Sequence, residues 1–331
     1  MHLYRIPVLY CPFDGAIHPQ VNEIEEHTLQ WLLDFKLVDN HNTFIKYKRN
    51  KFPQFIARTF PEGDFIDICT WCDLNSLLFI VDDFFDANHV IKDKQSFKQF
   101  QGKIMEILLY HKNFAIEDGP IFVAFSDIWE RLCLRSSSKW QSKFIGCIKK
   151  MFEGLYWQFK NISLGIYPAY EDYLEIRQYL GASHLSTDSL ELTGKIYLSE
   201  TVYRNSTVRR LTEISRNCVC FANDLFSLSK EKDESQNSGE YNLVGVMKRK
   251  FNLSWEEAIK KAADLHDDLV RKFIGLTPQA YVFDENTNKT LAKYIRALQI
   301  QMIANIEWST TETDRYPHIY SNHTEEIKLH D

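Results

Sequence analysis

The sequence predicts an all-α fold in a single domain. Its 331 residues include only 12 glycines and 9 prolines, about half of the usual share of ~12%, which favours long uninterrupted helices. Apolar residues recur at helical spacing over several long segments, whereas the alternation that is typical of strands is weak. Neither an internal repeat nor an interdomain linker divides the chain, so residues 1–331 are expected to form one domain.

The N-terminal part begins with an irregular segment and continues into helices. Residues 1–20 contain several prolines and a glycine and are expected to be irregular, and a helix is predicted over 21–35. The segment 58–61 interrupts the helical pattern. The next helix is expected to begin at 61–64 and to end at the acidic cluster 82–86. Anions are disfavoured at a helix C-terminus, so this position indicates a functional site or one that holds cations.

The remaining helices follow from apolar spacing and end signals. The segment 142–161 repeats apolar residues along one helix face, and 170–180 is a shorter helix that ends at Gly181. A further helix spans 208–230 and precedes a polar loop, 232–239. Ser254 carries the capping signal of a helix that repeats over 259–270, and another helix is marked over 291–302. Residues 317–331 are expected to form a C-terminal tail.

Charge and hydropathy exclude several function classes. The net charge of −6 leaves no electrostatic footprint for nucleic acid. The N-terminus lacks the apolar stretch of a signal peptide, and no run approaches the ~20 apolar residues that span a bilayer. We therefore expect a cytoplasmic protein without membrane insertion, whose seven cysteines are reduced thiols. Cys69 and Cys72 form a C-x-x-C without a redox context, which favours core packing.

Two clusters of oxygen donors stand out. Asn223, Ser227 and Glu231 recur every four residues, so a helix would present them as one stripe. Asp82 and Asp86 are also four apart and follow the apolar run 76–81. Either cluster alone fits a solvated acidic helix face about as well. Together, because Mg²⁺ prefers oxygen ligands, they predict a divalent-metal site between two helices.

These residues resemble the signatures of class I terpene synthases of the single-domain microbial type. The resemblance extends from Ala57 to Tyr316. The run Asp82-Asp83-Phe-Phe-Asp86 matches the D-D-x-x-D motif of that family, and residues 223–231 match its N-D-x-x-S-x-x-x-E motif. A single D-D-x-x-D would be weak evidence, whereas several signatures in the right order are hard to explain as a chance match.

Two further signatures concern the diphosphate of the substrate. Arg177 stands 46 residues before Asn223, where the family places a diphosphate-sensing arginine. Arg315 and Tyr316 resemble the terminal Arg-Tyr pair of the family, while Leu180 and Gly181 occupy its kinked segment after the sensor.

The resemblance implies a helical bundle around an apolar central cavity with three Mg²⁺ ions at its mouth, Mn²⁺ being a substitute. The expected metal ligands are Asp82, Asp86, Asn223, Ser227 and Glu231. The expected donors to the diphosphate are Arg177, Lys230, Arg315 and Tyr316. The expected catalytic residues are Asp82, Asp83, Arg177, Arg315 and Tyr316. By the same resemblance, Asp83 pairs with Arg177 on closure.

Elementary physical chemistry supports a metal-dependent release of diphosphate from the substrate. Two carboxylates about 4 Å apart repel by about 4 kcal/mol at an effective dielectric of about 20. Metals relieve that repulsion and neutralise the leaving diphosphate. The resulting carbocation requires a dry cavity with aromatic faces. Candidates for those faces are Phe52, Phe55, Phe79 and Trp308, for each of which core packing is an equal alternative.

The spacing of Trp308 and Arg315 suggests how the C-terminal region contributes. They are seven residues apart, which on one helix would place both on the same side and about 10.5 Å apart along the axis. Trp308 would then lie deeper than Arg315, beside the hydrocarbon chain, where it is expected to influence the product.

The function expected from the resemblance is cyclisation of farnesyl diphosphate to a sesquiterpene, with a homodimer as an open alternative to a monomer. A diterpene synthase acting on geranylgeranyl diphosphate is the close competitor. A chain-elongating prenyl transferase is less favoured, because a second aspartate-rich motif would replace residues 223–231. His266-Asp267 admits a metal-dependent phosphohydrolase, although a helix contact is the simpler interpretation. A non-catalytic helical binding protein would not need both metal ligands and phosphate donors.

Overall fold

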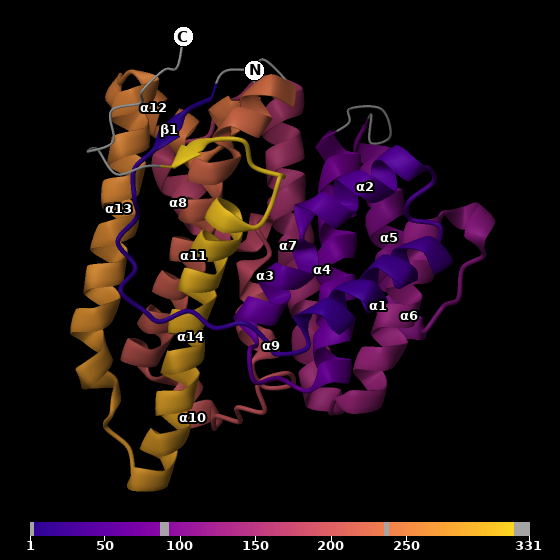
Figure 1. Cartoon of the computed structure of the whole chain (residues 1–331), viewed down its shortest axis with the longest axis horizontal. Helices are drawn as coiled ribbons and strands as arrows, with labels where there is room; N and C mark the ends of the chain where they lie inside the picture. Colours follow the sequence, from indigo (N-terminus) through magenta and orange to yellow (C-terminus); the bar gives the residue numbers. More distant parts are fainter. Residues whose placement is uncertain (1–2, 87–92, 235–237, 321–331) are drawn as a thin grey trace.

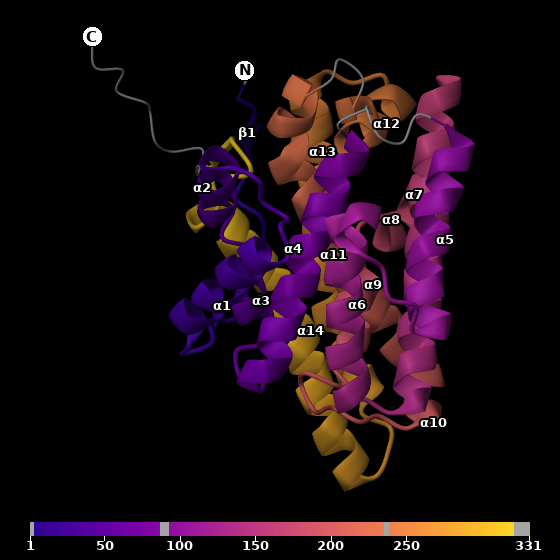
Figure 2. The ribbon, with the colours of Figure 1, turned by 90° about the vertical axis from the view of Figure 1, so that its right-hand side faces the viewer.

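The computed structural model describes residues 3–86, 93–234 and 238–320. Long helices dominate and form a bundle, several of them running roughly along the same direction (Figures 1 and 2). The first half contains α1 (Val21–Asp34), α2 (His41–Asn50), α3 (Phe52–Thr59), α4 (Phe65–Asp86), α5 (Lys94–Tyr110), α6 (Pro120–Arg135) and α7 (Ser138–Leu164). The second half contains α8 (Tyr170–Leu180), α9 (Ser183–Ser189), α10 (Glu200–Arg204), α11 (Ser206–Glu234), α12 (Leu243–Phe251), α13 (Trp255–Leu276) and α14 (Glu285–Thr311). The all-α prediction is confirmed.

The predicted helices are present, and most are longer than the sequence pattern indicated. The helix predicted over 170–180 has these bounds as α8, and that over 208–230 lies within α11. Ser254 caps α13 as predicted: its hydroxyl accepts from Glu257 N at 3.2 Å, and its own N–H donates to the Glu257 carboxylate at 2.8 Å. The predicted loop 232–239 is shorter, because α11 continues to Glu234; residues 235–237 lie outside the described part.

Several helices had not been assigned from the pattern, and α6 is one of them. Its buried residues recur at helical spacing along one face of the helix: Ile121, Phe122, Ala124, Phe125, Ile128, Trp129 and Leu132. The signal of an amphipathic helix was therefore present in this segment. Helix α11 is the centre of the arrangement, since it packs against α8, α9, α12, α13 and α14.

The two ends of the described chain meet in a short sheet. Strand β1 (Arg5–Ile6) pairs in parallel with β2 (Ile319–Tyr320), at the upper end of the bundle in Figure 1. Tyr4 N also donates to Ser229 Oγ of α11 at 3.1 Å. The irregular lead-in 1–20 and the tail 317–331 therefore each contribute a strand, which neither segment could indicate without its distant partner.

The core accounts for other residues that the sequence had singled out. Cys69 and Cys72 are buried free thiols in α4, which confirms their assignment to packing. His266 is buried in α13 beside Asp267, whose carboxylate accepts from Tyr10 N at 2.8 Å. The pair thus contacts the N-terminal segment and does not line the central cavity described below. None of the helices within the described ranges is both long and apolar enough to cross a membrane.

Candidate active site

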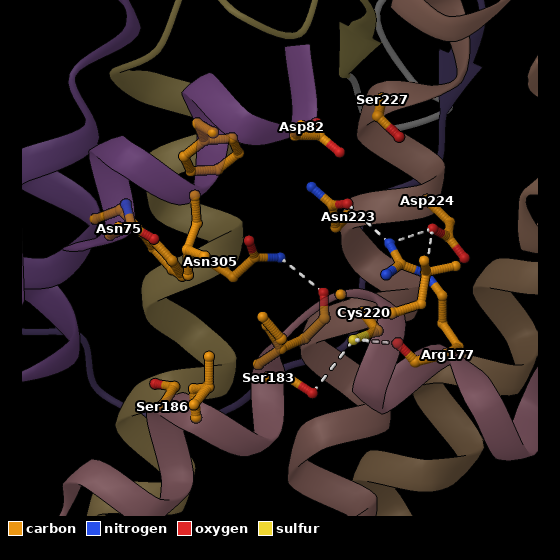
Figure 3. Close-up of a pocket in the computed structure, with 18 of the residues that line it drawn as sticks. Asn75, Asp82, Arg177, Ser183, Ser186, Cys220, Asn223, Asp224, Ser227 and Asn305 are labelled. Atoms are coloured by element: carbon orange, nitrogen blue, oxygen red, sulfur yellow. Dashed lines mark hydrogen bonds and ion pairs between the residues drawn. The ribbon is translucent and has the colours of Figure 1, made fainter. Parts of the chain in front are cut away.

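The central cavity has a volume of about 260 Å³ and is enclosed mainly by α3, α4, α7, α8, α9, α11 and α14. Residues of both predicted clusters gather at one end of it, where Figure 3 shows Asp82 facing Ser227 and Asn223 across the cavity. The rest of the wall is largely apolar and aromatic. Two helices far apart in the sequence thus bring the predicted donors to a common space.

The aspartate cluster lies at the end of α4, as predicted. Asp82 lines the cavity, whereas the side chain of Asp86 lies outside the described part. Arg315 holds Asp83 by a fork, with donor distances of 2.8 and 3.3 Å to the two carboxylate oxygens, and reaches Asp82 at 3.2 Å. Burial alone would raise the pKa of Asp83, but Arg315, Lys230 and Lys46 lower it below the ordinary value.

The polar stripe of α11 faces the same space. Ser227 Oγ donates to Glu231 Oε1 at 2.6 Å, and Asn242 Nδ2 donates to Glu231 Oε2 at 3.0 Å. Burial and, to a smaller extent, the nearby Asp224 raise the pKa of Glu231 to about 7. A metal cation next to this buried carboxylate would stabilise its charged form.

The donor set fits a hard divalent cation. Asp82, Asn223, Ser227 and Glu231 offer carboxylate, amide and hydroxyl oxygens, the ligands that Mg²⁺ and Mn²⁺ take. Among the described residues no three His, Cys, Asp or Glu side chains gather into a metal cluster. A metal at the α11 stripe would therefore use the neutral oxygens of Asn223 and Ser227 together with Glu231.

Arg177 is buried at the end of α8 and is fixed by Asp224, a residue that the sequence analysis did not select. Its guanidinium lies 2.7 Å from Asp224 Oδ1 and donates to Asn223 Oδ1 at 3.0 Å. Asp224 also accepts from Tyr173 OH at 2.8 Å and from Leu243 N at 3.2 Å. Burial alone would lower the pKa of Arg177, but Asp224 raises it well above the ordinary value. The position of Asp224 directly after Asn223 in the motif could have indicated it, although it does not share the helix face of Asn223, Ser227 and Glu231.

The pairing of Asp83 with Arg177 that the resemblance implied is not present in this structure. Arg177 is engaged by Asn223 and Asp224, whereas Asp83 is engaged by Arg315. The two motifs are instead linked through the C-terminal segment, because Asn223 Nδ2 donates to Tyr316 OH at 3.0 Å. Arg315 and Tyr316 thus connect the aspartate cluster of α4 to the stripe of α11.

The break between α8 and α9 lines the cavity beside Arg177. Gly181 ends α8, and Ala182 adopts a left-handed φ of 55° before α9 begins at Ser183. A Cβ atom at Gly181 would lie 2.1 Å from an Arg177 guanidinium nitrogen and 3.0 Å from Cys220 Sγ. Glycine is needed here because the guanidinium occupies the space of a side chain.

Gly181→Ala is therefore expected to displace Arg177 and to lower kcat/KM by more than about tenfold, the effect of losing one charged hydrogen bond. Gly146→Ala is the matched control, since a Cβ there meets no atom within 4 Å. Steady-state kinetics on both variants provide the measurement. Wild-type kinetics for Gly181→Ala would contradict the packing argument.

The geometry predicted for Trp308 and Arg315 is wrong in one respect. Helix α14 ends at Thr311, and Thr313 N donates to Trp308 O at 3.1 Å in the following turn. Arg315 therefore lies beyond the helix, so the two residues do not share a helix face. Trp308 nevertheless lines the cavity and packs edge-on against Tyr316, with ring centroids 5.6 Å apart.

The other aromatic candidates divide into two groups. Phe55 and Phe79 line the cavity, and Trp308 contacts both, at centroid distances of 5.2 and 5.9 Å. Phe52 is buried behind them, stacked on Phe79 at 4.2 Å, and is not among the lining residues. Of the two alternatives considered for Phe52, cavity wall and core packing, the structure supports core packing.

Trp308→Phe is expected to lower the free energy of unfolding by about 1–3 kcal/mol, because a buried hydrogen bond is lost. In the structure the indole N–H donates to Lys51 O at 2.8 Å. Since the indole also lines the cavity, the product spectrum is expected to shift toward earlier-quenched terpenes. Urea unfolding and product analysis give the two measurements. An unchanged product profile with lowered stability would assign Trp308 to the core alone.

Several polar residues of the cavity were missed by the sequence analysis. They lie away from the metal end and come from the three helices α4, α9 and α14: Asn75, Ser183, Ser186, Gln301 and Asn305. One signal was available, because Gln301, Asn305 and Trp308 follow the spacing of a single helix face.

Comparison with known proteins finds a matching family model and related enzymes. The family model described as terpene synthase family 2, C-terminal metal binding, matches residues 73–272, which include both clusters. The chain is 30% identical to a (+)-T-muurolol synthase of Roseiflexus castenholzii over 95% of this chain and 94% of that protein. It is 26% identical to a germacrene A synthase of Nostoc punctiforme over 93% and 94% of the two chains.

Solved structures share the fold. A crystal structure of α-eudesmol synthase matches with a TM-score of 0.77 at 21% identity, covering 91% of this chain and 98% of that chain. A linalool/nerolidol synthase from Streptomyces clavuligerus matches with a TM-score of 0.79 at 18% identity, covering 91% and 100%. At these identities the likeness concerns the arrangement of the helices.

Proposed function

Because the chain belongs to the terpene synthase family with a C-terminal metal-binding region, we propose that it cyclises farnesyl diphosphate to a sesquiterpene and releases diphosphate. It is accordingly a carbon-oxygen lyase that acts on an isoprenoid diphosphate. The observation that carries the proposal is the convergence of Asp82 with the Asn223–Ser227–Glu231 stripe at one end of a largely apolar cavity. The charged and metal-binding groups lie at this end of the cavity, and the apolar remainder suits a hydrocarbon chain.

Asp82 and Asp86 would hold metal on the α4 side, and Asn223, Ser227 and Glu231 on the α11 side. Bound Mg²⁺, with Mn²⁺ as a substitute, would neutralise charge on the leaving diphosphate. Three ions are the expected number. Occupation requires Arg315 to release the aspartates that it now contacts, and a diphosphate offers this guanidinium an alternative anionic partner.

The donors around the metal end would bind the diphosphate directly. Arg177, Lys230 and Arg315 supply positive charge, and the Tyr316 hydroxyl supplies a further hydrogen bond. Asp224 would act as a positioning residue, because its carboxylate holds the guanidinium of Arg177 at the cavity wall. As the carbon–oxygen bond breaks, these groups stabilise the charge that develops on the leaving oxygen.

The apolar wall would protect the carbocation. Phe55, Phe79 and Trp308 line the cavity, and aromatic rings can stabilise cations. Leu180 and Gly181 complete the wall beside Arg177. Exclusion of bulk water lets ring closure precede quenching.

The preferred substrate is expected to be the C15 diphosphate. The cavity volume of about 260 Å³ is near the lower limit of roughly 300 Å³ for ligand pockets, which favours C15 over C20 chains. The related (+)-T-muurolol synthase is itself described as cyclising (2E,6E)-farnesyl diphosphate.

Purified protein should be assayed with Mg²⁺ and the C10, C15 or C20 diphosphate, with products identified by gas chromatography and mass spectrometry. We expect kcat/KM for farnesyl diphosphate to exceed that for the C20 substrate at least about tenfold, since the C20 chain adds five carbons to a tight cavity. A higher specificity constant for geranylgeranyl diphosphate would overturn the C15 assignment, and no product from any of them would overturn the function.

A further inference from the structure

A group of polar side chains lies in the cavity away from the metal end. We call Asn75, Ser186, Gln301 and Asn305 the inner polar cluster. Figure 3 shows Asn75, Asn305 and Ser186 below Asp82 and Ser227. Asn75 precedes Asp82 by seven residues on α4, which places it about 10.5 Å farther along that helix. Asn75 is therefore too remote to bind the metal ions.

Asn75 carries the clearest sign that the cluster binds something. Its Nδ2 atom is fully buried and has no hydrogen-bond partner among the described residues. A buried amide without a partner is unfavourable, and such groups in folded proteins are normally satisfied by protein or by ordered water. Retaining this amide in a wall that otherwise suits a hydrocarbon points to a ligand with hydrogen-bonding capacity.

The two amides of α14 supply complementary acceptors. Asn305 and Gln301 are both buried, with 2% and 3% of their surfaces exposed. Their NH₂ groups are used locally: Asn305 Nδ2 donates to Val219 O and Gln301 Nε2 to Ser186 O, each at 3.2 Å. Neither amide oxygen accepts a hydrogen bond from the part of the chain that the structure describes. The cluster therefore presents a donor on α4 and acceptors on α14.

We propose that the inner polar cluster binds one water molecule that adds to the cyclised carbocation, so that the main product is a sesquiterpene alcohol. A water needs two to four polar partners, which a donor from Asn75 and acceptors from Asn305 and Gln301 provide. Held by these amides, a single water is kept apart from the cation until the chain has folded back onto this side of the cavity. The inference rests on the proposed function and specifies its product class.

The step balances without any further reagent. The carbon–oxygen bond to diphosphate breaks, and its electron pair leaves with the diphosphate. After ring closure, a lone pair of the water oxygen forms the new carbon–oxygen bond. The oxonium then loses a proton, which the released diphosphate accepts. One water is consumed for each alcohol formed, and no group is oxidised or reduced.

The wild-type enzyme provides the first test. It is incubated with farnesyl diphosphate and Mg²⁺ in H₂¹⁸O, and the volatile products are examined by mass spectrometry. The expected result is that the major product is an alcohol whose mass is two units higher than in ordinary water. A hydrocarbon as the major product would overturn this inference while leaving the proposed function intact. The lack of any metal-dependent product would reject both.

Asn75→Leu provides the second test, since leucine has nearly the same size and no polar atom. The ratio of alcohol to hydrocarbon is expected to fall about tenfold, as for the loss of one hydrogen bond at the branch point. Diphosphate release is measured in parallel, so that a change in the product ratio is separated from a change in the rate of ionisation. Asn75→Ser, which keeps a donor, should retain more alcohol than Asn75→Leu.

Asn217→Leu is the matched control. Asn217 is a buried amide of α11 whose Oδ1 also has no partner among the described residues, but it does not line the cavity. Its replacement should leave the product ratio unchanged. An unchanged ratio in folded Asn75→Leu, or an equal change in Asn217→Leu, would contradict the assignment of the water to this cluster.

Discussion

Removal of divalent metal is expected to abolish turnover, and Glu231→Gln to lower kcat by about 10²–10³-fold, the cost of losing one preorganised charge-stabilising group. Glutamine keeps the size of Glu231 and an acceptor for Asn242, which donates to the carboxylate at 3.0 Å. It removes the negative charge that a metal requires. Asp82→Asn and Asn223→Ala should have effects of the same order, because each removes an oxygen ligand.

The control for these variants lies on the same helix. Glu213 pairs with Arg210 on α11 and does not line the cavity, so Glu213→Gln should retain wild-type kinetics. Helical circular dichroism should be unchanged in all four variants. Full activity in excess EDTA would end the metal hypothesis, whatever the behaviour of the variants.

Arg177→Lys is expected to lower kcat/KM by about 10²-fold or more, even though the positive charge is retained. A guanidinium forms a planar fork and can bind two oxygens at once, whereas an ammonium is a point charge. Arg177 uses this fork toward Asn223 and Asp224. Lysine cannot reproduce both contacts and also reach a diphosphate. Arg204→Lys, at an exposed position of α10, is the control.

The same pair makes a separate prediction for stability. Asp224→Ala would leave the buried Arg177 without its carboxylate partner and should lower the free energy of unfolding by about 3–5 kcal/mol. Asp224→Asn keeps an acceptor for Tyr173 and should cost less. Urea unfolding measures both. Equal stability of Asp224→Ala and the wild type would show that the buried ion pair does not fix Arg177.

Periodicity identified the residues that share one helix, and structure was needed for those that meet from different elements. Asn223, Ser227 and Glu231 could be predicted to form a stripe because helical geometry alone sets their spacing. The pairing of Arg177 with Asp224 could not, since it depends on how α8 packs against α11. The parallel pair β1–β2 likewise joins segments from opposite ends of the chain.

Arg315 shows the limit of extending a helix by counting. The segment after Thr311 contains no glycine and no proline before Pro317, so the sequence carried no clear end signal. The chain nevertheless turns away, because Asp314 N donates to Arg49 O and the Arg315 guanidinium is drawn to Asp83. Tertiary contacts thus decided the end of α14.

The most direct test of the account is the position of bound metal. Crystals grown with Mn²⁺ and inorganic diphosphate should be measured at a wavelength where manganese scatters anomalously. We predict peaks at the mouth of the cavity, one in contact with Asn223, Ser227 and Glu231 and others against Asp82, with the diphosphate between them and Arg315. Anomalous peaks confined to other parts of the molecule, with diphosphate away from Arg177 and Arg315, would contradict the account.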